Sequence, residues 1–195
     1  MNTLKAQLRN MEKKAKQIRR QGYITGNLFG KEVNPSLPIQ INRMEAERAL
    51  KGCLVGSQVM LDVDGKEYDV IIKEMHYDSV KRQMLEIDFQ ALVRGEKVHS
   101  VAEIILTNKE KVVEGVLEQL LEEVSYRALP TDLVDKIYID AGELRLGSSI
   151  RVENLEISKN PNIDVLTHKD TMVVNVVPSK HVAEETVEET TEKEK

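Results

Sequence analysis

Short runs of alternating apolar and polar residues dominate the first ninety residues. Thr3 to Arg9 alternates Leu or Ala with polar side chains, which is the period of a half-buried strand. Leu37 to Ile41 repeats this period, and Pro38 favours a place at a sheet edge. Val59 to Ile72 is typical of a hairpin, because its two alternating runs flank Asp64-Gly65. Two more strands are predicted over Tyr23 to Phe29 and Gln83 to Val93.

Two short helices are predicted between these strands. The first covers about Glu12 to Arg20 and ends at Gly22, which can take the left-handed conformation that a helix C-cap prefers. The second covers Arg43 to Lys51, because Asn42 followed three residues later by Glu45 is a capping pattern. Several short strands with two small helices indicate a compact β-barrel or a strongly twisted sheet.

A second domain is expected where the charge balance changes, around Arg94-Gly95-Glu96. Gly115 to Val124 carries apolar residues at helical spacing, so its period alone predicts an amphipathic helix. From about Ser179 the chain is rich in Glu, Thr and Lys, which predicts a disordered acidic tail. Strands are predicted over Val98 to Thr107, Lys136 to Ala141 and Thr171 to Val177. The fold class is therefore mainly β, with an N-terminal β-barrel (1–93), a second β domain (94–179) and the tail (180–195).

Positive charge is concentrated at the N-terminus of an acidic chain. The 195 residues carry a net charge of −5, yet residues 1–92 hold 15 Lys+Arg against 12 Asp+Glu. The first twenty residues hold seven basic side chains and one acidic one. A polyanion partner would therefore meet the N-terminal part of the chain. The alternative is that the lysine-rich helix is only a solvated face.

Little in the sequence indicates catalytic or metal chemistry. The single Cys53 cannot form an internal disulfide, and the N-terminus lacks the apolar run of a signal peptide or membrane span, so a cytoplasmic location is expected. The four histidines lack metal-ligand spacing. Glu86 and Asp88 lie two apart on a predicted strand, a pair that could bind a cation but is far more often a solvated face. We expect no enzymatic activity, no cofactor, no small-molecule substrate and no membrane partner.

Three runs of residues carry a resemblance to a known family. They are R-R-Q-G-Y-I-T-G-N-L-F-G from Arg19, M-L-E-I-D-F from Met84, and G-V-L-E-Q-L-L-E-E-V-S-Y-R-A-L-P-T-D-L from Gly115, followed by I-D-A-G-E-L-R-L-G-S-S-I-R-V. The chain resembles the Ctc-type 5S-rRNA-binding ribosomal proteins of the bacterial large subunit, in the long two-domain form also known as a general stress protein. The resemblance implies an RNA-binding barrel and an all-β second domain. It therefore predicts strand, in part at least, where the period of 115–124 predicts helix.

The same resemblance implies a set of RNA-binding residues. The family uses an arginine at the end of the first strand, an arginine in the basic helix, a tyrosine closing the following strand, and the histidine and aspartate of a His-X-Asp-Phe motif. Arg9, Arg19 and Asp88 match this pattern, whereas Phe29 stands in place of the tyrosine and Glu86 in place of the histidine. Phe29 lacks the hydroxyl, and Glu86 would repel a phosphate by about 1 kcal/mol at about 4 Å in bulk water. The residues expected to meet RNA are Arg9, Lys16, Arg19, Arg20, Phe29, Glu86 and Asp88.

Two functions follow from these observations. The first is a structural ribosomal protein that binds 5S rRNA in the large ribosomal subunit and is linked to stress. The alternative is a divergent relative that has lost 5S rRNA binding and acts as a protein-binding or stress adaptor through its acidic second domain. Phe29 and Glu86 are the departures that favour the alternative, because both fall within the expected interface.

Overall fold

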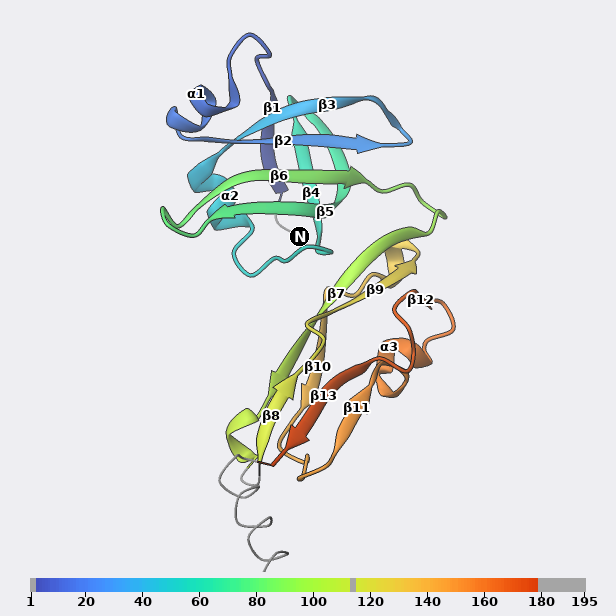
Figure 1. Cartoon of the computed structure of the whole chain (residues 1–195). Coiled ribbons are helices and arrows are strands. Elements are labelled where there is room, and N and C mark those ends of the chain that lie inside the picture. The colour runs from blue at the N-terminus through green and yellow to red at the C-terminus, as the bar shows by residue number, and fades with distance from the viewer. Residues whose placement is uncertain (1–2, 113–114, 179–195) are drawn as a thin grey trace, which may run out of the picture. The chain divides into compact units, whose positions relative to one another are not determined.

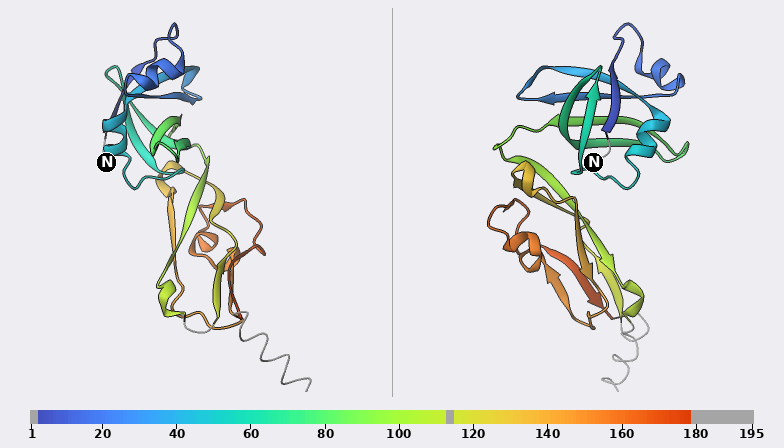
Figure 2. Two further views of the ribbon diagram at one scale, coloured as in Figure 1. Left: turned by 60° about the vertical axis from the view of Figure 1, so that its left-hand side comes forward. Right: turned by 180° about the vertical axis from the view of Figure 1, so that it is seen from behind.

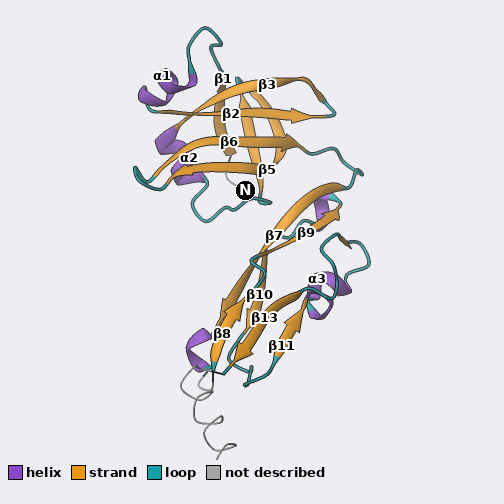
Figure 3. Cartoon of the chain, viewed as in Figure 1, coloured by secondary structure: helices purple, strands orange, loops and turns teal. Residues whose placement is uncertain are grey.

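Strands dominate the structure, a computed structural model that describes residues 3–112 and 115–178 (Figure 3). The chain divides into two compact units, Met1–Ala102 with Arg127–Asp135, and Glu103–Tyr126 with Lys136–Lys195. The prediction of a mainly β fold is confirmed. The predicted tail, 180–195, lies outside the described residues, and the predicted domain boundary after residue 93 stays a prediction.

A closed barrel forms the body of the first unit (Figure 1). Around the barrel the strand order is β1-β3-β2-β6-β5-β4. Parallel pairing of β1 with β4 closes the barrel, and β2 also runs parallel to β6. The predicted N-terminal barrel is thus confirmed. Its strands are β1 (Thr3–Leu8), β2 (Tyr23–Gly30), β3 (Val33–Asn42), β4 (Gln58–Val63), β5 (Lys66–Asp78) and β6 (Gln83–Ala91).

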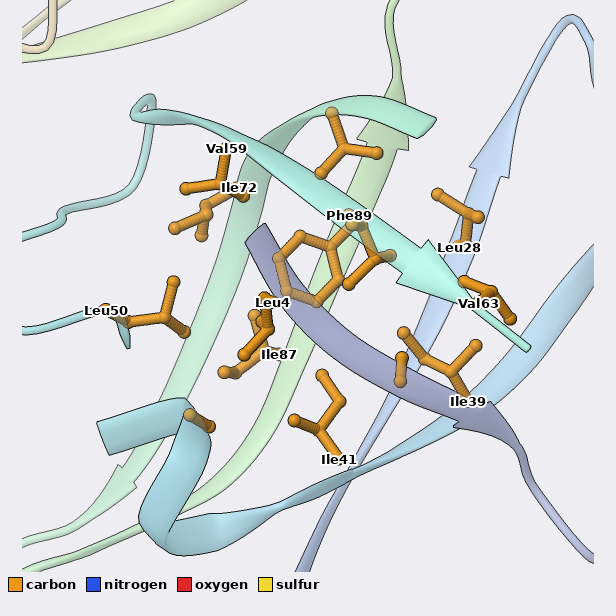
Figure 4. Packing of buried hydrophobic residues seen from close by; sticks show 14 of the residues in the cluster. Leu4, Leu28, Ile39, Ile41, Leu50, Val59, Val63, Ile72, Ile87 and Phe89 are labelled. Carbon is orange, nitrogen blue, oxygen red and sulfur yellow. The ribbon is translucent and has the colours of Figure 1, made fainter. Parts of the chain in front are cut away.

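The barrel interior is filled by alternate side chains of these strands. Phe89 lies in the middle of the cluster, surrounded by aliphatic side chains such as Leu4 and Ile41 (Figure 4). Gly26 allows β2 and β6 to approach closely, since a Cβ at this position would lie 1.9 Å from the carbonyl oxygen of Ile87. Inward residues alternate with outward ones along β4 and most of β6, as the period of a strand requires.

Both predicted helices are present beside the barrel (Figure 2). Helix α1 (Ala15–Arg20) is shorter than expected and ends before Gly22, whose φ of +89° is the left-handed conformation predicted for it. Helix α2 (Arg43–Ala49) begins after Asn42, whose side chain accepts hydrogen bonds from the backbone N–H groups of Met44 and Glu45. The predicted cap is therefore confirmed, and α2 adds Ala46 to the barrel core.

The predicted hairpin is also confirmed, whereas the predicted sheet edge is wrong. Asp64 and Gly65 both have positive φ, as a tight turn between β4 and β5 requires. Pro38, however, lies in β3, which pairs with β1 on one side and β2 on the other. The proline is tolerated because β1 ends at Leu8. The N–H that Pro38 lacks would therefore lie only at the end of the ladder between β1 and β3.

The remaining strands form two sheets in the orders β10-β7-β9-β12 and β11-β13-β8. Short helices connect several of them: η1 (Lys109–Lys111), η2 (Pro130–Asp132), η3 (Val152–Asn154) and α3 (Glu156–Lys159). The expectation of a second β domain is confirmed. The strands are β7 (Val98–Thr107), β8 (Val116–Gln119), β9 (Glu123–Ala128), β10 (Lys136–Asp140), β11 (Ser149–Arg151), β12 (Asp164–Val165) and β13 (Met172–Val177).

The helix predicted from the period of Gly115 to Val124 is wrong. This stretch forms β8 and the start of β9, and β8 pairs antiparallel with β13, with Leu117 opposite Val176. Leu120, which a helix would have placed on its apolar face, is 56% exposed in the connection between the strands. Pairing with a distant strand decided the conformation, and the strand expected from the resemblance is confirmed.

Candidate nucleic-acid interface

A row of polar residues crosses the outer face of the barrel. The strand register pairs Gln7 with Gln40, Gln40 with Thr25, Thr25 with Glu86, and Glu86 with His76. Directly paired residues point to the same side of a sheet. Their neighbours along the strands, such as Ile24, Ile39 and Ile87, are fully buried in the barrel core, so the row faces outward. We call these residues the first outer row.

A second outer row runs beside the first. Arg9 directly follows β1, and its backbone N–H donates to the carbonyl of Pro38 at 2.9 Å. Pro38 is paired with Asn27, Asn27 with Asp88, and Asp88 with Glu74. This row therefore places a guanidinium group and two carboxylates on one face, although they come from different strands.

Asp88 is held as a fixed acceptor in the second outer row. Its Oδ1 accepts hydrogen bonds from both the backbone N–H (2.9 Å) and the side-chain Nδ2 (3.1 Å) of Asn27. Among the described residues no lysine or arginine forms an ion pair with this half-buried carboxylate. Its Oδ2 is therefore oriented and available to accept from a hydroxyl or amino group of a ligand.

Arg9 presents a donor that the protein leaves unsatisfied. The residue is half-buried, and its Nε is buried without a hydrogen-bond partner among the described residues. A buried donor without a partner costs about 1–3 kcal/mol, and more when the group is charged. Such a cost is relieved if the side chain turns outward to meet an acceptor on a ligand.

Helix α1 brings a second group of cations to this face. The helix packs on β2 and buries Ile18, which lies outside the barrel cluster, to 1% exposure. Arg43 anchors it, since its Nη2 donates to the carbonyl of Arg19 at 2.8 Å. Lys16 and Arg20 are exposed and Arg19 is half-buried, and no carboxylate in the described part of the chain forms an ion pair with any of them. Their charge is therefore available to a polyanion.

The other predicted residues lie on the same wall of the barrel. Phe29 is 36% exposed near the end of β2, paired with Gln90 of β6. Glu86 is half-buried in the first outer row and, among the described residues, makes no side-chain hydrogen bond or ion pair. The structure thus brings Arg9, Glu86 and Asp88 together in the two outer rows and sets α1 against the strand that carries Phe29.

Sequence reasoning missed two residues that position this face. Asn27 orients Asp88, and Arg43 fixes the end of α1. Neither role has a sequence signal of its own, because each depends on a partner 24 to 61 positions away in the chain. Only the strand register and the packing of the helices reveal them.

Other kinds of site find no support in the described ranges. No group of three or more His, Cys, Asp or Glu side chains there could hold a metal ion. In the same ranges, no helix is long and apolar enough to cross a membrane.

Comparison with known proteins matches both halves of the chain. The model of the Ribosomal L25p family matches residues 4–89, and that of the Ribosomal protein TL5, C-terminal domain, matches residues 97–180. A protein of Halothermothrix orenii is 34% identical over 188 residues, covering 93% of this chain and 85% of the relative. One from Carboxydothermus hydrogenoformans is 27% identical, covering 97% and 94% of the two chains. Both relatives are named large ribosomal subunit protein bL25.

Proposed function

The chain belongs to the bL25 family of large ribosomal subunit proteins, and from this premise we propose that its barrel unit binds 5S rRNA within that subunit. The protein is a structural component of the ribosome, since its family is structural rather than catalytic. The surface that we propose to meet the RNA consists of the two outer rows and α1.

The proposal rests on one observation: the second outer row contains both an unsatisfied donor and an oriented acceptor. Arg9 has a buried Nε without a partner among the described residues, and Asp88 in the same row is held by Asn27. RNA duplexes are recognised through phosphates and 2′-hydroxyls across a shallow minor groove. Arg9 can donate to a phosphate, and Asp88 can accept from a 2′-hydroxyl, so the row suits RNA rather than DNA.

The cations of α1 supply the part of the affinity that does not depend on base sequence. Lys16, Arg19 and Arg20 have no ion-pair partner in the described chain, so binding a phosphate does not require breaking an internal salt bridge. Each neutralised phosphate releases a counterion, which makes binding weaken as salt is added. Phe29, on the neighbouring strand, offers a ring that can pack against a base or sugar.

An electrophoretic mobility shift assay with 5S rRNA tests this proposal. We expect binding at about 50 mM salt that weakens steeply by about 200 mM. The variant Arg19→Ala should weaken binding by about 1–3 kcal/mol and reduce the salt dependence. Arg145→Ala is the matched control, because Arg145 is an exposed arginine of the second unit.

Absence of binding at low salt would refute the proposal. If the protein nevertheless sediments with large subunits, the alternative of an adaptor that has lost 5S rRNA contact is favoured instead. The expected link to stress is tested separately, by comparing growth of a deletion strain with and without heat or salt stress. Equal growth of the deletion and parent strains under stress would remove that link.

A further inference from the structure

Glu86 places a negative charge on the face that is proposed to bind RNA. It lies in the first outer row between Thr25 of β2 and His76 of β5, and its carboxylate is not neutralised by any described lysine or arginine. Glu74 and Asp88, paired in the second outer row, add two further carboxylates nearby. A polyanion that approaches β5 and β6 at these positions therefore meets negative charge first.

His76 is the basic side chain that the register places within this group. Residues 74–76 and 86–88 of the two strands contain three acidic side chains, two apolar ones and this histidine. The His76 side chain is 53% exposed, and its Nε2 lies 3.7 Å from Oε2 of Glu74. On the other flank of Glu86, Thr25 is 1% exposed and uncharged. Of the two residues paired with Glu86, His76 of β5 is therefore the one with an exposed donor.

Irregular pairing between β5 and β6 favours this placement. The register shifts between Ile72 and Glu74 and again between His76 and Tyr77. Bulges re-aim side chains locally and recur at binding sites. Here they bracket Glu74 and His76, and both side chains are exposed on the outer face.

We propose that His76 is an RNA-contacting residue that acts together with Glu86, and that the RNA-binding face extends across β6 onto β5. The inference rests on the proposed 5S rRNA binding. The imidazole donates an N–H to a phosphate or a 2′-hydroxyl of the RNA, beside the carboxylate of Glu86, which can only accept. Directly paired side chains of an antiparallel ladder have Cβ atoms about 5 Å apart, so the two positions are close enough to share one contact region of the RNA.

Exchange of the two residues gives the sharpest test. With a 5S rRNA transcript at low salt, His76→Ala should weaken binding about tenfold, the loss of one hydrogen bond to a charged group. His76→Gln should keep most of the affinity, because the amide still donates. The double variant H76E/E86H should bind within about threefold of the parent chain, since the pair is only transposed across the ladder. Single Glu86→His should bind more tightly than the parent, most clearly at low salt.

His168→Ala is the matched control for these variants. His168 is also exposed, and its Nδ1 lies 3.7 Å from a carboxylate oxygen of Asp170, but it belongs to the second unit. Its loss should leave 5S rRNA affinity unchanged.

Two results would overturn the inference while leaving the proposed function standing. In the first, His76→Ala binds 5S rRNA as tightly as the parent chain while Arg19→Ala binds clearly less tightly. This would place β5 outside the interface. The second is loss of binding in H76E/E86H with an unchanged melting temperature, which would show that the two positions do not act together. If the parent chain does not bind 5S rRNA at low salt, the proposed function itself fails, and this inference fails with it.

Discussion

At the scale of single residues, the barrel presents polar atoms that the protein satisfies only in part. The Nε of Arg9 has no acceptor among the described residues, whereas Oδ1 of Asp88 has two donors from Asn27. Under the proposed function both groups contact the RNA: Arg9 gains an acceptor on binding, and Asp88 is already oriented to meet a donor. Asn27 differs from both, because it holds Asp88 in place.

Arg9 should therefore matter for binding and little for folding. We expect Arg9→Ala to weaken 5S rRNA binding by about 1–3 kcal/mol, measured by mobility shift, because the RNA acceptor loses the donor proposed for it. Arg9→Lys should recover only part of the loss, since lysine lacks the planar fork of donors. The melting temperature should stay level or rise, because a buried unsatisfied donor is removed. A large fall in melting temperature with unchanged affinity would mean that Arg9 is structural.

Gly26 should be intolerant of any side chain. A Cβ there would lie 1.9 Å from the carbonyl oxygen of Ile87, so Gly26→Ala forces β2 and β6 apart. We expect the free energy of unfolding to fall by about 3 kcal/mol or more, measured by denaturant titration. Gly52→Ala is the comparison, because Gly52 has a φ of +82° but no atom within 4 Å of a Cβ, and it should lose only about 1–2 kcal/mol. Equal losses would show that crowding at Gly26 is not decisive.

At the scale of elements, α1 is a small helix that depends on its docking. Six residues are too few for a stable isolated helix, so its order comes from Ile18 buried at β2 and from the hydrogen bond between Arg43 and the carbonyl of Arg19. Under the proposed function, the cations of α1 meet the RNA only while these contacts hold. The position of the helix therefore depends on one apolar side chain and one hydrogen bond.

Replacing Ile18 should separate docking of the helix from stability of the barrel. We expect Ile18→Ala to release α1, to raise amide hydrogen exchange over Ala15–Arg20, and to reduce both the affinity for 5S rRNA and its salt dependence. Exchange in β6 should change little, because Ile18 lies outside the barrel cluster. Gln17→Ala, at an exposed position on the same helix, is the control. Uniformly faster exchange across the barrel would show that α1 is part of the barrel's cooperative core.

At the scale of the whole molecule, the chain divides into two units, and the first unit contains more than the barrel. The barrel cluster ends at Ala91, yet the first unit also contains residues up to Ala102 and Arg127–Asp135. Lys31 forms an ion pair with Glu96, and the hydroxyl of Ser57 donates to Asp135 at 3.1 Å. The barrel strands alone therefore form a closed structure, and the added segments supply further contacts.

A fragment of residues 1–93 should fold and bind 5S rRNA. It contains every strand of the barrel, both helices and the whole apolar cluster. We expect it to unfold cooperatively, at a lower temperature than the intact chain because it lacks Glu96 and Asp135. Near-UV circular dichroism and a thermal melt would check this, with limited proteolysis near Arg94 to Lys97 as the companion test. A fragment without a cooperative transition would show that the barrel needs the later segments.

Features that depend on neighbours along the chain could be predicted from the sequence. The alternating strands of the barrel, the Asp64-Gly65 turn and the Asn42 cap are local choices, which is why they could be predicted. The sequence also carried the family resemblance, and with it Arg9, Arg19 and Asp88. The tertiary structure decided what depends on distant partners. It made 116–119 into strand by pairing it with β13, placed Pro38 in a strand with a partner on either side, joined Asn27 to Asp88, and set His76 opposite Glu86. The physical reason is that pairing across strands is set by closure of the barrel and burial of its core, and no short stretch of sequence contains that information.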